Sequence, residues 1–272
     1  MKRKPIVAGT FYPGDSIILR NQLERFLSNV SMLPSKKDIL GVIAPHAGYV
    51  YSGQSAAYAY KALKMKQFNK AVILAPSHRY GNFKFSAGNF ESYLTPLGEV
   101  KVDTDKIEKL LQYSEFSFHQ AAHNAEHSLE VQLPFLQIIN EQVEIIPILL
   151  GNQSPENSKR LAEILFDEFK DDIINTVFIV SSDLSHYYDH KIAKYMDEKM
   201  IDMILKTDVQ GLSNALFERK IEACGFGGIL SLMHLAKQLA YNETELLNYS
   251  HSGMISGDNS QVVGYLSAMI YK

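Results

Sequence analysis

Cysteine is nearly absent from this chain of 272 residues: Cys224 stands alone, so no intramolecular disulfide can form. No apolar run approaches the roughly 18–20 residues of a membrane-spanning helix. The formal net charge is only −3, and we therefore expect neither nucleic acid nor a membrane as a partner. The basic start, residues 1–4, is not followed by an apolar run, which predicts no signal peptide and a reducing, cytoplasmic setting.

Short signatures of several large enzyme classes are also missing. The sequence contains no G-x-G-x-x-G, no Walker A motif, no G-x-S-x-G elbow and no C-x-x-C pair. It has no internal repeat, no low-complexity tract and no linker rich in Pro, Gly or Ser. We therefore expect one domain over residues 1–272, long enough to bury a sizeable core.

Short apolar runs bounded by turn residues recur along the chain. Both faces of these runs are apolar and β-branched residues are frequent, which predicts buried strands. The predicted strands are residues 39–45, 70–76, 144–151, 176–182 and 262–271. Helical patterns occupy residues 15–29, 53–65, 104–113, 129–140, 156–170, 190–205 and 228–240. This alternation predicts an α/β fold in which a mostly parallel central sheet is flanked by helices.

Two local patterns refine this expectation. Ser154 followed by Pro155 predicts a helix N-terminus, because serine caps helices and proline suits their first turn. Residues 81–103 fit neither the strand nor the helix pattern, and we expect a hairpin or an irregular excursion there.

A histidine follows each of three predicted strands within a few residues. These are His46, His78 and His186, the last of them accompanied by Asp183. In open α/β sheets ligands bind at this edge, because the strand ends and their loops converge there. One histidine near a strand end is more often a structural polar group, but three such placements predict a shared site.

Imidazole is a ligand for Zn, Cu, Fe and Ni, so these histidines predict a metal site. Asp183 and His186 are either further ligands or a general base with its orienting carboxylate. A purely structural alternative has Asp183 capping the next helix.

A second cluster of polar residues lies in the segment HNAEHSLEVQLPFL, residues 123–136. Its first five residues match the H-x-x-E-H metallopeptidase pattern. Ser128 is a natural N-cap for the amphipathic run that follows, which places 123–127 in a loop and argues against that pattern. Glu130 then lies in the first helical turn, where the helix dipole favours a carboxylate. We expect His127 and Glu130 either to face the site or to form a solvated helix start.

The lone cysteine lies in the segment EACGFGG, residues 222–228. A single buried cysteine is usually a small hydrophobic group. Beside strand-end histidines, however, Cys224 gains a second interpretation as an anionic ligand. The helix predicted from residue 228 would then lower the thiol pKa through its N-terminus.

Several motifs together resemble one known family. They are GVIAPHAGYVYSG, APSHRY, HNAEHSLEVQLPFL, IIPILLG, SSDLSHY and EACGFGGI, in this order. This order resembles the Memo family, also called AmmeMemoRadiSam system protein B. The early VAGTFYPGD, residues 7–15, is similar to the family's N-terminal signature. The resemblance extends over nearly the whole chain.

The resemblance implies a fold like that of LigB-type class III extradiol dioxygenases. It also implies a metal site with His46, His78 and Cys224 as ligands, and with Asp183 and His186 beside them. In the dioxygenases the third ligand of the iron is a carboxylate, and here Cys224 stands at that position. A thiolate changes the charge and the redox tuning of an iron ion, so ring-cleaving activity does not follow from the resemblance.

The leading hypothesis is a Memo-type metal-binding protein that acts as a non-haem iron redox enzyme. Fe(II) is the expected ion, with Cu or Zn as alternatives, and the expected substrate is a small phenol or catechol. His186 would serve as the acid–base group, supported by Asp183, and Tyr49, His127 and Glu130 would contact the substrate or support the ligands.

Two alternatives remain at this point. One is a non-catalytic module that binds a peptide or a protein in the same cleft. The other is a zinc-dependent hydrolase, since zinc accepts the same nitrogen and sulfur ligands and activates water. Family association further implies AMMECR-type and radical SAM proteins as partners.

Overall fold

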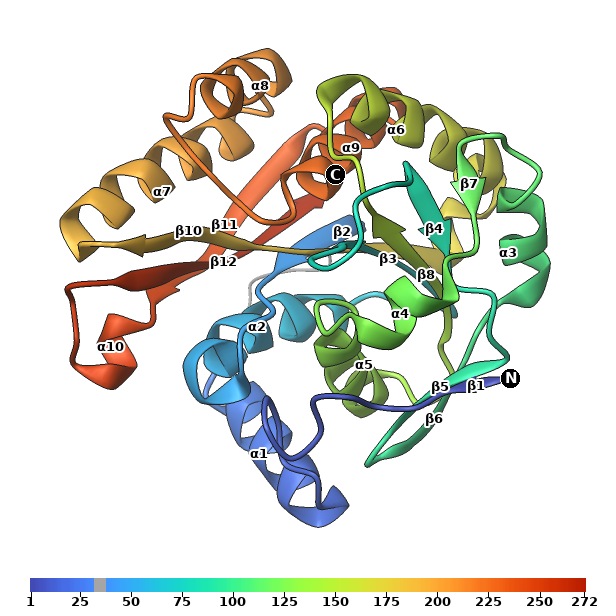
Figure 1. Cartoon of the computed structure of the whole chain (residues 1–272), viewed down its shortest axis with the longest axis horizontal. Coiled ribbons are helices and arrows are strands. Elements are labelled where there is room, and N and C mark those ends of the chain that lie inside the picture. Colours follow the sequence, from blue (N-terminus) through green and yellow to red (C-terminus); the bar gives the residue numbers. More distant parts are fainter. Residues whose placement is uncertain (32–37) are drawn as a thin grey trace.

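A nine-stranded mixed sheet forms the centre of the fold in the computed structural model, which describes residues 1–31 and 38–272 (Figure 1). Its strands are β2 (Ile39–Ala44), β3 (Lys70–Pro76), β4 (Phe85–Ala87), β7 (Phe116–Ser117), β8 (Glu144–Leu150), β9 (Thr176–Ser181), β10 (Asp183–Tyr188), β11 (Glu243–His251) and β12 (Val262–Tyr271). They follow the order β10-β12-β2-β9-β3-β8-β4-β7, and β11 also pairs with β12.

The four central strands β2, β9, β3 and β8 are parallel and consist of continuous apolar runs. Every residue of β2 and β9 is buried, because other elements cover both faces of the sheet. Four of the five predicted strands form this centre. The predicted single-domain α/β fold is confirmed, and it is consistent with a fold of the LigB type.

The edges of the sheet are antiparallel. The fifth predicted strand, β12, pairs antiparallel with β2, and β10 and β11 both pair antiparallel with β12. The sequence pattern predicts neither β10 nor β11, because DLSHYY and ETELLNYSH are too polar for a buried strand and do not alternate strictly. The sheet is therefore mixed, with its parallel strands at the centre.

Helices cover both faces of this sheet. They are α1 (Ser16–Ser28), α2 (Tyr49–Leu63), α3 (Thr104–Leu110), α4 (Gln120–Ala125), α5 (Leu133–Ile139), α6 (Pro155–Phe169), α7 (His190–Leu205), α8 (Val209–Phe217), α9 (Phe226–Gln238) and α10 (Gly253–Ser256). Figure 1 shows α1, α2 and α5 on one side of the sheet and α6 and α9 on the other. Helix α7 packs beside β10 and β11. Helices α4, α8 and α10 are absent from the sequence prediction.

The start of α6 confirms one capping prediction. The Ser154 side chain accepts a hydrogen bond from the Asn157 amide at 3.1 Å, and Pro155 occupies the first turn. An N-cap serine satisfies an amide that has no partner within the helix. The Ser154-Pro155 pattern involves only neighbouring residues, and no contact elsewhere in the fold prevents Ser154 from capping α6.

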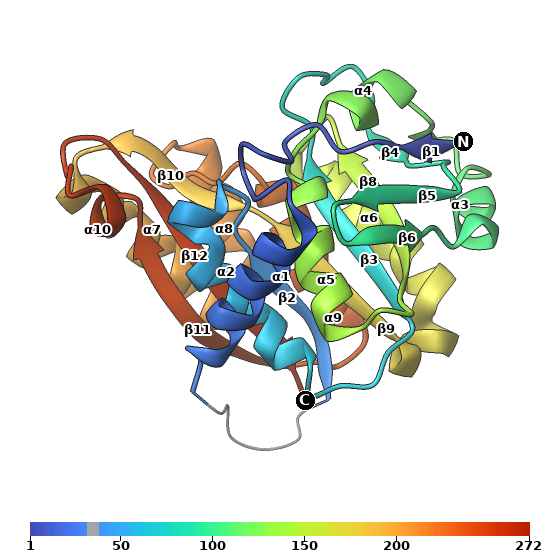
Figure 2. The same ribbon diagram turned by 90° about the horizontal axis from the view of Figure 1, so that it is seen from below.

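Residues 81–103, which fit neither pattern, contribute β4 to the large sheet and two strands to a second, three-stranded sheet. It consists of β1 (Lys2–Arg3), β5 (Ser92–Thr95) and β6 (Gly98–Lys101). Strands β5 and β6 form the expected hairpin, and Gly98 has the positive φ of +120° that favours glycine in its turn. The N-terminal strand β1 pairs parallel with β5, as Figure 2 shows.

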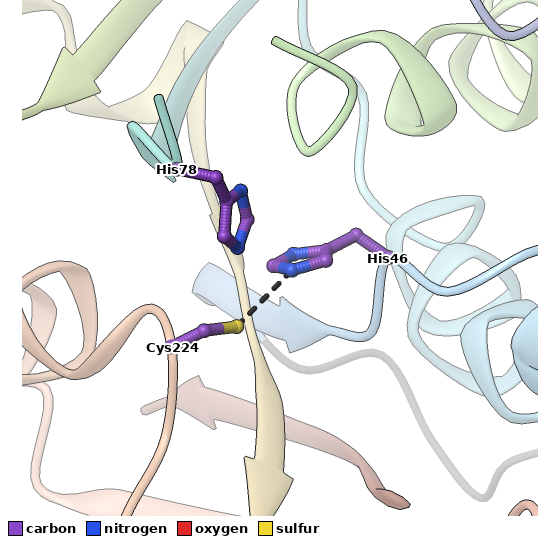
Figure 3. Close-up of side chains that lie close together, drawn as sticks. All are labelled: His46, His78 and Cys224. Atoms are coloured by element: carbon purple, nitrogen blue, oxygen red, sulfur yellow. Dashed lines mark hydrogen bonds between the residues drawn. The ribbon is translucent and has the colours of Figure 1, made fainter. Parts of the chain in front are cut away.

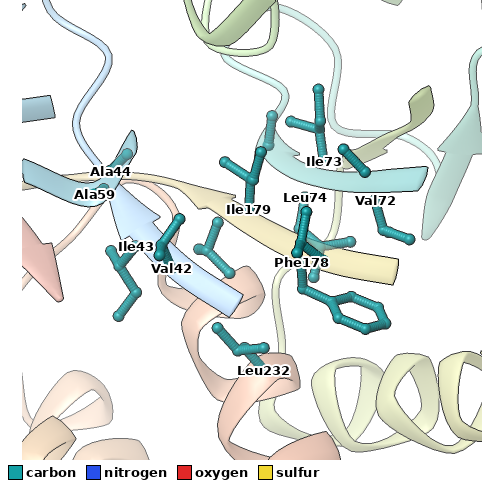
Figure 4. Close-up of a cluster of buried hydrophobic side chains, with 14 of the residues drawn as sticks. Val42, Ile43, Ala44, Ala59, Val72, Ile73, Leu74, Phe178, Ile179 and Leu232 are labelled. Atoms are coloured by element: carbon teal, nitrogen blue, oxygen red, sulfur yellow. The ribbon is translucent and has the colours of Figure 1, made fainter. Parts of the chain in front are cut away.

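The hydrophobic core lies where the central strands meet the helices. Figure 4 shows side chains of β2, β3 and β9 packed together with those of α2 and α9. Phe178 is fully buried, and each such side chain contributes about 1.5–3 kcal/mol of burial free energy. Helix α9 approaches the sheet closely at Gly228, where an added Cβ would lie 3.0 Å from Val180 Cγ1. This close packing fixes the loop that precedes α9.

The helices of the described ranges, 1–31 and 38–272, include none that is long and apolar enough to cross a membrane.

Candidate metal centre

Three potential ligand atoms converge at the carboxyl edge of the central sheet. His46 follows β2, His78 follows β3, and Cys224 lies in the loop between α8 and α9. One ligand atom from each residue lies within 4.8 Å of the others, and Cys224 Sγ is 3.1 Å from His46 Nε2. Figure 3 shows the three side chains pointing toward one another. The structure thus brings together the three residues that the family resemblance implies.

Hydrogen bonds fix the tautomer of the His46 ring. The Ser181 hydroxyl donates to the Ser128 carbonyl at 2.7 Å, so it has only lone pairs left for other partners. It accepts from Gln132 Nε2 at 2.8 Å, and that amide is oriented because its nitrogen also donates to the Pro45 carbonyl. His46 Nδ1, 2.9 Å from the same hydroxyl, must therefore carry the proton. His46 Nε2 is left bare and directed at Cys224.

A carboxylate orients the second histidine. His78 donates its amide to Glu126 Oε2 at 2.6 Å and its ring Nδ1 proton to Glu126 Oε1 at 2.8 Å. Burial works against the charged imidazole, but the hydrogen bond and charge of Glu126 outweigh it and raise the His78 pKa. Burial also opposes ionisation of Glu126, yet His78 and nearby amides lower its pKa to about 2. A carboxylate at one ring nitrogen directs the other toward a metal.

Glu126 itself is not a free ligand, although His78, Glu126 and His127 form a second group of the required spacing. Its Oε1 already accepts from His78 Nδ1 and from the amides of His127 and Ser128, both at 3.0 Å. Its Oε2 accepts the His78 amide. The carboxylate is satisfied by protein donors, which fits a supporting role rather than coordination.

His127 lies beside the cluster, as expected from the sequence. Its ring stacks on His78 with centroids 4.8 Å apart and lies 5.5 Å from the His46 ring. Burial lowers its pKa, against the opposing charge of Glu126. Phe11 packs against its far side at 4.9 Å. The neutral ring of His127 therefore forms one wall of the site.

The Cys224 thiol is held as a protonated group. Burial, followed by the charge of Asp183, raises its pKa well above the usual value, whereas the sequence predicts a lowered pKa from the helix that follows. That prediction is wrong because desolvation outweighs the dipole of α9. Burial also lowers the His46 pKa well below its ordinary value. A protonated thiol thus faces a bare imidazole nitrogen, and a bound cation would take the place of the proton.

Asp183 begins strand β10 and does not cap a helix, so the capping alternative is wrong. Its Oδ1 accepts the His46 amide at 2.8 Å, and burial raises its pKa to about 6. His186, on the same strand, donates its amide to Glu222 Oε1 at 2.7 Å, and its ring Nδ1 lies 3.9 Å from that oxygen. Glu222 is therefore the carboxylate that pairs with the His186 ring, and sequence reasoning missed it.

Tyr49 and Glu130 have their polar atoms bound to other groups of the protein. The Tyr49 hydroxyl donates to the Val131 carbonyl at 2.6 Å, and the side chain is buried. Glu130 is completely buried and pairs with Arg3 and with the Tyr12 hydroxyl. Both residues have their polar atoms engaged within the protein, which places them in the support of the site rather than on its surface.

The segment before Glu130 differs from the sequence prediction in two ways. His123 belongs to α4 rather than to a loop, and its ring contacts Tyr93 and Ser86 instead of the cluster, which excludes the metallopeptidase pattern. The Ser128 hydroxyl donates to the Pro76 carbonyl at 2.9 Å and caps no helix. A 3₁₀ turn, Glu130–Gln132, precedes α5.

A cavity of about 650 Å³ adjoins the cysteine loop. Glu222, Ala223 and Phe226 line it from that loop, and Gln153 lines it from the end of β8. The Gln153 amide also donates to the Cys224 carbonyl at 2.8 Å, so it touches both the cavity and the loop. The cavity has the size of small-molecule sites in proteins, but none of the three cluster residues lines it.

Comparison with known proteins gives one family. The family described as "Memo-like protein" matches residues 3–269. A MEMO1 family protein of Nitrosopumilus maritimus is 38% identical over 276 residues, covering 97% of this chain and 98% of the relative. MEMO1 family proteins of Methanosarcina mazei and Sulfurisphaera tokodaii are 36% and 39% identical, each covering 98% of both chains. The strand-end site and these full-length matches agree, and the chain belongs to the Memo-like protein family.

Proposed function

We propose that the protein binds one Fe(II) ion through His46 Nε2, His78 Nε2 and Cys224 Sγ. The observation that carries this proposal is the convergence of three donor atoms within 4.8 Å, with Nδ1 of each ring held by a hydrogen bond so that Nε2 is the nitrogen available to a metal. Two imidazoles and one thiolate suit Fe, Cu and Zn better than Mg or Ca. The residues present therefore fit a transition-metal ion.

The donor set supports a catalytic rather than a purely structural site. Structural zinc sites usually have four protein ligands, whereas catalytic sites have three and keep a position open. A bound Fe(II) ion would supply redox chemistry and a Lewis acid next to that open position. We propose a small phenolic substrate, in keeping with the aromatic wall that His127 provides beside His46 and His78.

The chain's own groups would then move protons around the substrate. His186 is partly exposed at the edge of the site, and its ring lies near Glu222. We assign it the acid–base role, because imidazole is the side chain that most often transfers protons in catalysis and this ring is partly exposed. Asp183 fixes the His46 amide and so holds the first ligand loop in place. The reduced thiol that this site requires fits a cytoplasmic setting.

The thiolate supports a second candidate. Zinc binds cysteine and histidine readily, and an open position on zinc activates water for hydrolysis. A zinc-dependent hydrolase is therefore the alternative that the donor set allows, with copper as a further possible ion.

Elemental analysis of protein purified without oxygen tests the proposal. We expect one iron ion per chain in the wild type and loss of that ion in His46→Ala, His78→Ala and Cys224→Ala. His234→Ala is the matched control, because His234 lies on α9 outside the cluster. Stoichiometric zinc would favour the hydrolase, and an absence of bound metal in the wild type would contradict the metal site altogether.

A further inference from the structure

The N-terminal segment crosses the loop that supports the metal cluster. Figure 2 shows this segment passing α4 on its way from β1 to α1. Glu130 holds it in place by accepting the amides of Ile6 and Val7 at 2.9 and 3.0 Å and the Tyr12 hydroxyl at 2.6 Å. The segment is thereby fixed against residues 123–130, which include Glu126.

Arg3 makes the contacts that reach toward the cluster. Its side chain is only 1% exposed, and its guanidinium group has three partners within residues 123–130. Nε donates to the His123 carbonyl at 3.2 Å, Nη2 donates to the Glu126 carbonyl at 2.7 Å, and Nη1 donates to the Glu130 carboxylate. One rigid planar group thus binds the loop at positions 123, 126 and 130.

The Glu126 contact links Arg3 to a proposed metal ligand. Arg3 holds the backbone carbonyl of Glu126, while the side chain of Glu126 receives the amide and the ring Nδ1 proton of His78. If the loop shifts by a few tenths of an ångström, both hydrogen bonds to His78 lengthen together. The ring orientation of His78 depends on them.

We propose that Arg3 is a positioning residue for the metal site, acting through Glu126 on His78. Its consequence for metal binding rests on the proposed function, whereas its effect on the His78 ring does not. The sequence signal for this role is only a basic residue near the N-terminus, and its partners lie more than 100 positions away.

Lysine cannot replace arginine in this role. The guanidinium fork presents donors in fixed directions, and an ammonium group has the same charge but no fixed plane. Arg3→Lys keeps a cation for Glu130 and loses the geometry that binds the two carbonyls. We expect about a tenfold weaker metal affinity, at the low end of the loss that follows removal of a group supporting a ligand.

Two readouts separate positioning from general destabilisation. The first is the His78 tautomer in the metal-free protein, read from long-range ¹H–¹⁵N spectra and assigned with His78→Ala. The second is the affinity for Fe(II), measured without oxygen by competition with a chromophoric chelator. Tyr12→Phe is the matched control, because it removes a bond to Glu130 and leaves the contacts of Arg3 with the loop in place. Lys2→Ala is a second control, since the Lys2 side chain pairs with exposed Glu99 on the surface.

We expect Arg3→Lys to lose the single Nδ1–H form of His78 and to bind the ion more weakly, while both controls retain both properties. If Arg3→Lys does not fold, Arg3→Met combined with Glu130→Gln removes the buried charges as a pair and serves as the variant, with the same expected result. Unchanged His78 spectra in the folded variant would overturn the proposal. Equal losses in Tyr12→Phe would also overturn it, because they would show a purely structural effect.

The two claims fail separately. If the wild type binds no metal and Arg3→Lys still disturbs His78, the proposed function is wrong and the positioning role stands. If the wild type binds the ion and Arg3→Lys changes neither readout, the proposed function stands and the role of Arg3 is wrong.

Discussion

Replacing Ser181 with alanine removes the group that fixes the tautomer of His46. The hydroxyl donates to the Ser128 carbonyl and accepts from Gln132 Nε2 and His46 Nδ1. In Ser181→Ala these three buried groups lose a partner. His46 can relieve part of this loss by moving its proton from Nδ1 to Nε2, where the proton occupies the atom that would bind the metal.

The expected magnitude follows from these contacts. An unsatisfied buried polar group costs about 1–3 kcal/mol, so we expect the free energy of unfolding to fall by about that amount. Removal of a group that orients a metal-binding histidine usually weakens metal affinity by about 10–100-fold. At about 1.4 kcal/mol per tenfold, the loss of binding free energy is about 1.4–2.8 kcal/mol.

Ser267→Ala is the matched control for this experiment. Ser267 is also a fully buried serine at the sheet, and its hydroxyl donates to the Ser55 carbonyl at 2.6 Å. Chemical denaturation should give a comparable loss of stability for both variants. Chelator competition with Fe(II) should show weaker binding in Ser181→Ala alone. Equal affinity in Ser181→Ala and the wild type would refute the reasoning about the tautomer.

Three further predictions follow from other contacts. Glu126→Gln should weaken metal affinity about 10–100-fold in the same assay, because the charged partner of the His78 ring is lost. Burial raises the Asp197 pKa, so the contribution of Asp197 to stability should fall as pH rises above about 3.8, the unfolded pKa, and through the higher folded pKa. Asp197→Asn should reduce this slope in denaturation curves, whereas exposed Asp202→Asn should not. Gly41→Ala should cost about 1–3 kcal/mol of stability, since its Cβ would lie 2.5 Å from the Phe178 carbonyl oxygen, and an undiminished melting temperature would contradict this.

The centre of the sheet was predictable because burial on both faces leaves a clear sequence pattern. Strands β2, β3, β8 and β9 are continuous apolar runs, and no other element type of that length fits them. Strand β10 escapes prediction for the opposite reason. Its residues include Asp183 and His186, which lie near the site, and these polar residues interrupt the apolar pattern that identifies a buried strand.

Two serines show how tertiary contacts override a local signal. Ser154 and Ser128 both precede an amphipathic run, and the same capping pattern applies to each. Ser154 caps α6, because its hydroxyl accepts the Asn157 amide. Ser128 instead donates to the carbonyl of Pro76, far away in the sequence. The amphipathic run that follows Ser128 therefore starts with a 3₁₀ turn rather than with a capped α-helix. A rule based on neighbours along the chain cannot detect that competition.

The grouping of His46, His78 and Cys224 was predictable, whereas the groups that hydrogen-bond to them were not. Histidines at two strand ends point to the same edge of the sheet, and the family resemblance adds Cys224. The role of the Glu126 carboxylate could not be predicted, because its partner His78 lies in another loop. The predicted lowering of the Cys224 thiol pKa was wrong for a physical reason. Desolvation depends on the packed environment, which the residues flanking Cys224 do not reveal.

X-ray absorption of the anaerobic, iron-loaded protein tests the central claim most directly. The account predicts one sulfur neighbour at roughly 2.3 Å from the ion, as in other metal–thiolate bonds, together with nitrogen neighbours at roughly 2.0–2.1 Å. The sulfur signal should disappear in Cys224→Ala. A spectrum with only nitrogen and oxygen neighbours, unchanged in Cys224→Ala, would contradict the assignment of His46, His78 and Cys224 as the metal site.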